Sequence, residues 1–203
     1  MQGSESPRIF AHDLACRRGD RVLFRRLSLD LGPGTACHVT GANGSGKTTL
    51  IRTLAGLTPP LTGTARCEGA VGLFDERIGL DPERTLGTAL DFWFALDGAS
   101  DPSAVLERLC LSTLVDVPVR YLSTGQRKRA GLARLLGQNA PVWLLDEPLS
   151  GLDTASQALV SKLIAEHLDN QGTALIASHQ ALDVPGLETL AIEDFAVREE
   201  ALP

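Results

Sequence analysis

Short runs of apolar residues, separated by polar turns, extend from residue 8 to residue 34 and predict short β-strands. The turns fall at residues 18–20 and 32–34, where glycine, aspartate and proline cluster. A further strand, TACHVTG, ends at Gly41. Because no helical pattern separates the early strands, they favour a small antiparallel layer at the N-terminal end of the domain.

The apolar positions take up helical spacing directly after this strand. KTTLIRTLAGL predicts a helix, for which Gly56 suits the C-terminal cap and the prolines at 59–60 prevent continuation. Residues 85–96 and 102–114 predict two more helices, joined by a turn over residues 97–102. We therefore expect a helical subdomain over residues 80–125.

The second half of the chain alternates buried strands with a helix. PVWLLDEP and GTALIASH carry short apolar runs, which are typical of parallel strands covered on both faces. Residues 155–168 between them have a helical apolar face, and LETLAIED is interpreted as an edge strand. Strands that alternate with helices indicate an α/β domain built on a parallel sheet with right-handed crossovers.

Length and composition fit one globular domain that spans residues 1–203. The net charge is -6, which argues against a nucleic-acid partner. No apolar run approaches the roughly 20 residues of a membrane-spanning helix. The first ten residues lack the layout of a secretory signal. We therefore expect a cytoplasmic protein, unless a partner holds it at a membrane.

The cysteines and histidines do not indicate a metal or haem site. The four cysteines form no CxxC pair and no CxxCH motif, so we expect them to be reduced and mostly buried. Three of the four histidines, His12, His38 and His167, are isolated from other potential ligands. We interpret these three as surface or packed side chains, because metal sites need clustered ligands.

GANGSGKT, at residues 41–48, lies between a predicted strand and a predicted helix and fits the phosphate-binding pattern G-x-x-x-x-G-K-[ST]. Its glycines allow successive backbone N–H groups to point at phosphate oxygens, and the following helix adds the positive end of its dipole. We expect Lys47 to reach the β- and γ-phosphates, Thr48 to ligate Mg²⁺ and Thr49 to add a phosphate contact. The candidate nucleotide-binding residues of this loop are Gly41, Ala42, Asn43, Gly44, Ser45, Gly46, Lys47, Thr48 and Thr49.

Acidic and imidazole side chains follow two of the predicted buried strands. Asp146 ends the strand VWLLD and is expected to hold Mg²⁺ through water. Glu147 comes next and is placed to polarise the attacking water as a general base. His179 follows the strand TALIA and is expected to reach the γ-phosphate and orient the same water. Glu147, His179 and Lys47 are therefore the candidate catalytic residues.

A second polar helix start, LSTGQ at residues 122–126, precedes a basic helical stretch. The chain thus carries GANGSGKT, LSTGQ, VWLLDEP, SGLD and then His179, in that order. This set resembles the nucleotide-binding domains of ATP-binding cassette (ABC) proteins over nearly the whole chain. The resemblance implies a P-loop NTPase with a RecA-like parallel sheet, which binds ATP with Mg²⁺ and hydrolyses it.

The resemblance also implies a dimer of two copies arranged head to tail. Each ATP would lie between GANGSGKT of one subunit and LSTGQ of the other. Ser123, Gly125 and Gln126 would then meet the nucleotide of the partner, with Ser123 and Gly125 at the γ-phosphate. Asp153, in SGLD, would cross the same interface and link the two sites.

Two positions depart from the family pattern. The family usually has a glutamine before the helical subdomain, whereas residues 70–83 contain none and Glu76 lies nearest that position. We expect the carboxylate of Glu76 to touch the metal shell instead. The family also often stacks an aromatic side chain on adenine, but the segment here reads CRRGDR, so Arg17 or Arg18 is expected to take that place.

Longer strings narrow the resemblance to one branch of the family. LACRRGDRVLFRRLSLDL, LIRTLAGLTPPLTG, TALDFWFAL and QRKRAGLARLLGQNAPVWLLDEPLSGLD, with SHQAL at the end, resemble the haem-exporter ATP-binding subunits of bacterial cytochrome c maturation. This branch implies separate integral membrane subunits as partners. It also implies a peripheral position on the cytoplasmic face of the bacterial inner membrane. Haem as the cargo rests on resemblance alone, because nothing in the sequence indicates haem binding.

Three other interpretations remain open. The chain also fits the ATPase subunit of another small ABC transporter. A soluble DNA-repair or chromosome-associated ABC ATPase would need a coiled-coil or zinc-binding insertion before LSTGQ, where this chain has only the short helical region. A P-loop small-molecule kinase needs an acceptor site and a lid but no LSTGQ, so ATPase activity without a phosphate acceptor would separate it.

Overall fold

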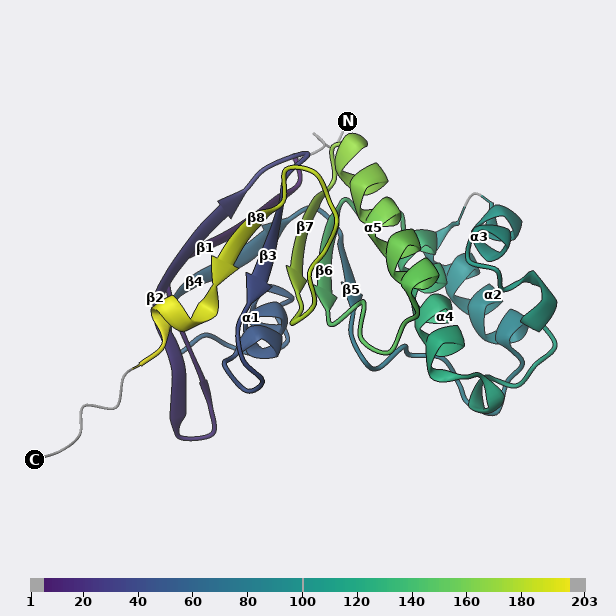
Figure 1. Ribbon diagram of the computed structural model, residues 1–203, viewed down its shortest axis with the longest axis horizontal. Helices are drawn as coiled ribbons and strands as arrows, with labels where there is room; N and C mark the ends of the chain where they lie inside the picture. The colour runs from purple at the N-terminus through teal and green to yellow at the C-terminus, as the bar shows by residue number, and fades with distance from the viewer. Residues whose placement is uncertain (1–5, 100, 198–203) are drawn as a thin grey trace, which may run out of the picture.

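The computed structural model describes residues 6–99 and 101–197 of the chain. A five-stranded sheet lies at the centre of this part, a three-stranded sheet lies on one side of it, and a group of helices lies on the other (Figure 1). Strands and helices alternate along the second half, so the predicted α/β class is confirmed.

The three-stranded sheet has the strand order β2-β1-β4 and is antiparallel. β1 (Arg8–Arg18) and β2 (Arg21–Leu31) are joined by a tight turn, in which Gly19 has a positive φ of 60°. β4 (Thr62–Glu68) pairs with the other edge of β1. The predicted antiparallel layer is therefore present, although β1 and β2, with 11 residues each, are longer than the short strands expected.

The five-stranded sheet has the order β5-β6-β7-β3-β8 and is parallel. Its strands are β3 (Ala36–Thr40), β5 (Val71–Phe74), β6 (Val142–Asp146), β7 (Thr173–Ala177) and β8 (Glu188–Ala191). β6 and β7 are buried along their whole length and β8 lies at an edge, as the sequence predicted. Because the carboxyl ends of parallel strands meet at one edge, the segments after β3, β6 and β7 come together there.

Alternate residues of β6 contribute to two separate apolar cores. Val142 and Leu144 belong to the core that includes α1 (Lys47–Leu54) and the antiparallel sheet. Trp143 and Leu145 belong to the core on the other side, beneath the remaining helices. Side chains alternate across a strand, so a strand covered on both faces needs apolar residues at every position.

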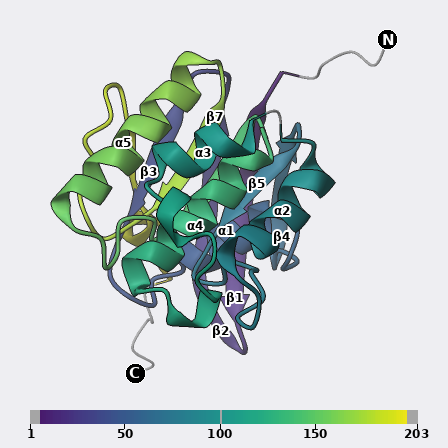
Figure 2. The same cartoon turned by 90° about the vertical axis from the view of Figure 1, so that its right-hand side faces the viewer.

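The helices on that other side are α2 (Leu86–Asp97), α3 (Pro102–Arg108), α4 (Thr124–Gly137) and α5 (Thr154–Asp169). Figure 2 shows α3, α4 and α5 in front of the sheet. Three short 3₁₀ turns are η1 (Ser112–Leu114), η2 (Val119–Tyr121) and η3 (Ile192–Phe195). None of the helices formed by residues 6–99 and 101–197 combines the length and apolar character needed to cross a membrane.

The helix predicted over residues 102–114 is wrong in its length. α3 ends at Arg108, and residues 112–114 form the separate turn η1. Cys110 has a positive φ of 52°, and a residue in this left-handed conformation cannot continue a right-handed helix. The apolar spacing of this stretch therefore continues past the end of the helix itself.

All four cysteines are free, as expected. Cys16 and Cys37 are buried and Cys67 is half-buried, whereas Cys110 is exposed. Burial raises the pKa of the Cys37 and Cys67 thiols to about 11, so both stay protonated near neutral pH. These side chains therefore act as packing groups.

Candidate functional site

The phosphate-binding loop connects β3 to α1 at the carboxyl edge of the parallel sheet. Gly41 and Gly46 have positive φ angles of 144° and 117°, which favour glycine. A Cβ atom on Gly46 would also lie 3.0 Å from the ring of Phe24, and one on Gly41 would lie 2.8 Å from the side chain of Ile192. Both backbone conformation and close packing therefore require glycine at these two positions.

Lys47, the first residue of α1, is buried with 6% of its surface exposed. Its Nζ donates hydrogen bonds to the carbonyl oxygens of Gly41 and Ala42, at 2.7 and 3.1 Å. Within residues 6–99 and 101–197, no carboxylate forms an ion pair with it. The ammonium group is thus held against the loop, and its charge remains available for an anionic ligand.

A partly open cavity of about 120 Å³ lies between this loop and residues distant in sequence. It is lined by Arg18, Leu23, Gly44, Gly46, Lys47, Thr48, Thr49 and Glu147. Glu147 therefore lies beside the loop, although about a hundred residues separate them in the chain. Of the two arginines proposed to stack on adenine, Arg18 lines this cavity and Arg17 does not. Leu23 was not predicted, because nothing in an ordinary strand pattern marks it.

Glu147 is held by hydrogen bonds from three directions. Its N–H donates to the carbonyl oxygen of Ala177 at 2.8 Å, and its own carbonyl oxygen accepts from Nζ of Lys128 at 2.6 Å. Its Oε2 lies 2.8 Å from Nδ1 of His179, so the two predicted catalytic side chains are in contact. The backbone φ of Glu147 is +49°, a sparsely populated conformation that costs about 1–3 kcal/mol and that surrounding contacts must maintain.

Asp146 ends β6 in a buried position. Burial raises the pKa of its carboxyl group, while a hydrogen bond with Thr48 opposes that shift and the charges of Glu147, Asp75 and Glu76 add to it. Its Oδ1 is buried without a hydrogen-bond partner. A free carboxylate oxygen close to a threonine hydroxyl fits a hard divalent cation that prefers oxygen ligands.

The described residues, 6–99 and 101–197, contain no cluster of three or more His, Cys, Asp or Glu side chains able to hold a metal ion. Mg²⁺ is commonly bound by one or two protein ligands together with water and substrate phosphates. Thr48 and Asp146 would then supply the protein ligands. Glu76 is exposed and affects Asp146 through its charge.

The LSTGQ segment forms the start of α4. Ser123 Oγ accepts a hydrogen bond from the N–H of Gln126 at 3.2 Å, and Gln126 Oε1 accepts one from the N–H of Ser123 at 2.8 Å. This reciprocal capping box fixes the helix start. A Cβ atom on Gly125 would meet only Leu152, at 3.8 Å, so this side of the helix start is open. Asp153 caps α5 in a similar way, since it accepts from the N–H of Ser156 at 2.7 Å.

The two predicted phosphate-binding helix starts lie on different sides of the parallel sheet. α1 packs into the core on the side of the antiparallel sheet, and α4 packs into the core on the opposite side. None of Ser123, Gly125, Gln126 or Asp153 lines the cavity beside the phosphate-binding loop. Within one chain, the structure therefore does not bring these residues to the loop.

Residues 24–150 match the ABC transporter family. The chain belongs to the ABC transporter family. It is 52% identical to the cytochrome c biogenesis ATP-binding export protein CcmA of Novosphingobium aromaticivorans, over 92% of this chain and 96% of that protein. It is 46% identical to the protein of the same name from Zymomonas mobilis, over 93% of this chain and 86% of that one.

The fold is also that of solved ABC proteins. An ABC transporter ATP-binding protein from Pyrococcus furiosus superposes with a TM-score of 0.81 and 24% identity, covering 94% of this chain and all of that one. The predicted family and P-loop fold are therefore confirmed, and the chain is an ABC ATPase subunit. The roles of individual residues remain predictions.

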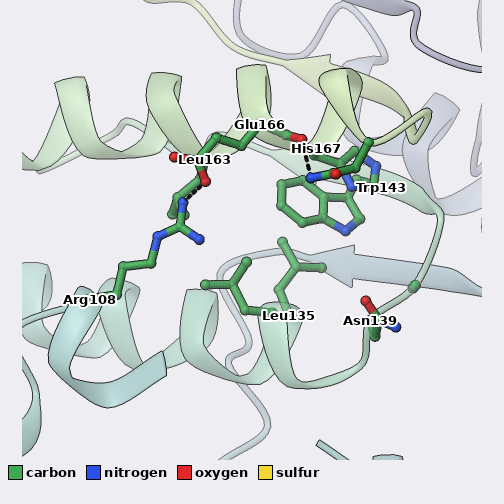
Figure 3. Close-up of a pocket in the computed structure, with 10 residues that line it drawn as sticks. Arg108, Leu135, Asn139, Trp143, Leu163, Glu166 and His167 are labelled. Carbon is green, nitrogen blue, oxygen red and sulfur yellow. Dashed lines mark hydrogen bonds and ion pairs between the residues drawn. The ribbon is translucent and has the colours of Figure 1, made fainter. Parts of the chain in front are cut away.

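This ABC ATPase has a second, larger cavity of about 480 Å³ where α3, α4 and α5 meet (Figure 3). The rings of Trp143 and His167 stack in it with centroids 3.9 Å apart. Arg108 of α3 and Glu166 of α5 form an ion pair that joins the helical subdomain to the core. None of the predicted nucleotide-binding residues lines this cavity, so it belongs to the junction between subdomains.

We expect the free energy of unfolding to decrease as the pH falls below about 6.5, the usual pKa of an unfolded histidine. Burial lowers the pKa of His167, although hydrogen bonds to the carbonyl oxygens of Thr173 and Pro141 oppose this. The unfolded chain then takes up the proton first, so stability present above pH 6.5 is lost as the pH falls towards the lower folded-state pKa.

Urea unfolding at pH 7.5 and pH 5.5 measures this loss. His167→Gln should lose less stability between the two pH values than the wild type does. His12→Gln removes an exposed histidine and is the matched control, which should keep the full loss. A loss in His167→Gln equal to that of the wild type would contradict the assignment.

Proposed function

We propose that this chain is the ATP-hydrolysing subunit of an export complex for cytochrome c biogenesis, and that haem is the cargo of that complex. It works as a head-to-tail dimer, attached to integral membrane subunits on the cytoplasmic face of the bacterial inner membrane. The observation that supports hydrolysis most directly is the 2.8 Å contact between Glu147 and His179 beside the phosphate-binding loop. The relatives named for cytochrome c biogenesis support the choice of complex.

ATP binding is the task of the loop at residues 41–49. Backbone N–H groups at the start of α1 and the ammonium of Lys47 bind the β- and γ-phosphates, which exchange for the carbonyl oxygens that Lys47 now contacts. Thr48 and Asp146 would hold Mg²⁺, which neutralises charge on the phosphate oxygens. Arg18 lines the same cavity, so its side chain lies where it can stack on the adenine ring of ATP.

Hydrolysis needs a base that accepts a proton from the attacking water. Glu147 suits this role, because its carboxylate is 21% exposed, close to Lys47 and Thr48, and oriented through Nδ1 of His179. His179 itself is 51% exposed, so its ring is also accessible to the γ-phosphate. The proton from water is taken up at a carboxylate oxygen of Glu147.

The head-to-tail dimer accounts for the open helix start of α4. Ser123 and Gly125 present a hydroxyl and backbone N–H groups on a side of the chain away from its own loop. A second copy would bring its ATP to this helix start, where the dipole of α4 favours the negative charge of the γ-phosphate. Gln126 fixes the start of α4 through its capping box with Ser123, and Asp153 caps the start of α5.

The face of the helical subdomain that carries Phe92 and Leu96 is the proposed docking surface for the membrane subunits. Both side chains belong to α2, one turn apart, and are 59% and 66% exposed. Phe92 also lines a cavity of about 230 Å³ between α2 and the loop around Gly79, where the Trp93 Nε1–H donates to the carbonyl oxygen of Gly79 at 3.0 Å. Large apolar side chains exposed side by side indicate a protein interface.

Purification of the full chain from solubilised membranes tests the proposal. We expect integral membrane proteins of cytochrome c maturation to accompany the wild type. Phe92→Asp combined with Leu96→Asp should reduce their recovery at least about tenfold, because each buried apolar side chain contributes about 1.5–3 kcal/mol.

Leu57→Asp is the matched control, since Leu57 is 59% exposed and follows α1 on the other side of the sheet. It should leave recovery unchanged. Recovery of the membrane subunits of an unrelated transporter would overturn the assignment to cytochrome c biogenesis. Full recovery with the double variant would move the docking surface elsewhere.

A further inference from the structure

Lys128 is a lysine of α4 whose position the proposed mechanism does not explain. It is one of three lysines in the chain, with Lys47 and Lys162, and it comes two residues after the LSTGQ segment. Its half-buried ammonium group donates a hydrogen bond to the backbone carbonyl oxygen of Glu147 at 2.6 Å. The side chain of Lys128 thus extends from α4, the helix capped by Ser123, to the backbone of Glu147, the predicted general base.

The surroundings of Lys128 are acidic, yet its contact is with the backbone. Burial lowers the pKa of its ammonium group, and the charges of Glu147, Glu76 and Asp146 oppose that shift. In the part of the chain that the structure describes, no carboxylate oxygen forms an ion pair with Lys128. The ammonium group of Lys128 therefore lies near the carboxylates of the site, but its hydrogen bond is to the backbone carbonyl oxygen of Glu147.

That peptide group belongs to a strained residue. Glu147 has a φ of +49°, and its N–H is already bound to the carbonyl oxygen of Ala177 on β7. Its carbonyl oxygen accepts a short bond from Lys128 at 2.6 Å and a longer one from the N–H of Ser150 at 3.4 Å, so the peptide groups on both sides of this Cα are held. The direction of the carboxylate towards His179 follows from the backbone, and loss of either anchor would allow relaxation towards an ordinary conformation.

We propose that Lys128 is a positioning residue, which holds the backbone of Glu147 in the conformation that aims its carboxylate at the attacking water. The inference deepens the proposed function and rests on it. In that dimer the start of α4 meets the ATP of the partner, whereas Glu147 serves the ATP of its own subunit. Lys128 consequently connects the two ATP sites through one side chain.

Kinetics of Lys128 variants in the full-length protein provide the first test. Lys128→Met keeps most of the length of the side chain but loses the N–H donors, so kcat for ATP hydrolysis should fall about 10- to 100-fold, because small misplacements of reacting groups have effects of this size. The dissociation constant for ATP, measured by equilibrium binding, should stay within about twofold, since Lys128 is not expected to touch the nucleotide. Lys128→Arg keeps a donor of similar reach and should recover much of kcat.

Lys162→Met is the matched control, because Lys162 is exposed on α5 and its ammonium group pairs with Glu166, 3.9 Å away. It should keep the wild-type kcat. Lys128→Gln loses the reach of lysine but stays polar, and gives the same test should the methionine variant fail to fold. A kcat within twofold of the wild type in the variants that fold would overturn the proposal, and so would an ATP affinity that falls in parallel with kcat.

A mixed dimer shows through which subunit Lys128 acts. When Lys47→Ala is mixed with Ser123→Arg, the one intact site takes its loop and its Glu147 from the Ser123→Arg subunit. Lys128→Met added to that subunit should lower the recovered activity about 10- to 100-fold, and the same change in the Lys47→Ala subunit should leave it unchanged. The reverse pattern would overturn positioning of Glu147. If the parent mixture recovers neither activity nor a mixed ATP-bound dimer, the head-to-tail arrangement has failed instead. Whenever the parent mixture is inactive, kcat of the Lys128 homodimers decides the proposal alone.

Discussion

Glu147→Gln should bind ATP at least as tightly as the wild type and hydrolyse it at least about 100-fold more slowly, since positioned general bases contribute about 10²–10⁴ in rate. The amide has the shape of the carboxylate but cannot accept the proton of the attacking water. It also lacks the negative charge that repels the γ-phosphate. An ATP-bound dimer should therefore accumulate.

The structure explains why this substitution should remove the base without disturbing the backbone around it. The peptide groups around residue 147 are held by Ala177 and Lys128, and neither bond involves the side chain. The glutamine can still form a hydrogen bond with His179, which lies 2.8 Å from the glutamate oxygen. The strained backbone at φ +49° should survive, so the loss of rate reports the loss of the base.

Steady-state ATPase assays, equilibrium ATP binding and size-exclusion chromatography with ATP measure the three effects. Glu107→Gln, on the exposed surface of α3, is the matched control and should behave as the wild type does. Hydrolysis at the wild-type rate in Glu147→Gln would place the base elsewhere, with Asp146 and Glu76 as the candidates. The contact between Glu147 and His179 would then need a structural explanation.

Mixing Lys47→Ala with Ser123→Arg should restore ATPase activity that each variant lacks alone. Lys47 is the one lysine of the phosphate-binding loop, so its loss removes the cation that binds the β- and γ-phosphates. An arginine at position 123 places a bulky side chain where the partner's γ-phosphate must approach. Each homodimer is therefore defective at both of its sites.

The mixed dimer contains one site that is wholly wild type. Its loop comes from the Ser123→Arg subunit and its LSTGQ segment from the Lys47→Ala subunit, while the other site carries both defects. Random pairing makes about half of the dimers mixed, each with one good site of two, so about a quarter of the wild-type activity is expected. If both halves of a site came from one chain, every chain would carry its own defect and mixing would restore nothing.

Coupling between the two sites could suppress turnover in the mixed dimer even when its intact site binds ATP. Adding Glu147→Gln to both chains allows ATP-dependent dimer formation to be followed by light scattering, without hydrolysis. Absence of both recovered activity and a mixed ATP-bound dimer would contradict the role assigned to LSTGQ. Because α1 and α4 lie on opposite sides of the parallel sheet, we expect the mixed ATP-bound dimer to form.

Features encoded in contiguous residues were predictable from the sequence. The loop at residues 41–48 could be recognised because its glycines, lysine and threonine act through one turn between a strand and a helix. β6 and β7 were recognised because a strand covered on both faces must be apolar throughout. The order of the motifs also sufficed for the family, which the match over residues 24–150 bears out.

The end of α3 shows where local pattern failed. Apolar spacing continued to residue 114, but the helix stops at Arg108 and Cys110 adopts a left-handed backbone conformation. Spacing records which positions face the core, and Leu109 and Leu111 do so without belonging to the helix. Periodicity therefore located the segment and misjudged its backbone.

Only the tertiary structure decided which distant residues meet at the site. The contact of Glu147 with His179 requires that β6 and β7 are neighbours, and the sequence does not state the strand order β5-β6-β7-β3-β8. The position of Lys128 on the backbone of Glu147, and of Arg18 rather than Arg17 beside the loop, depends in the same way on packing between separate elements. Motifs are written in neighbouring residues, whereas distances between motifs are set by strand order, register and the two cores that press α1 and α4 against opposite faces of one sheet.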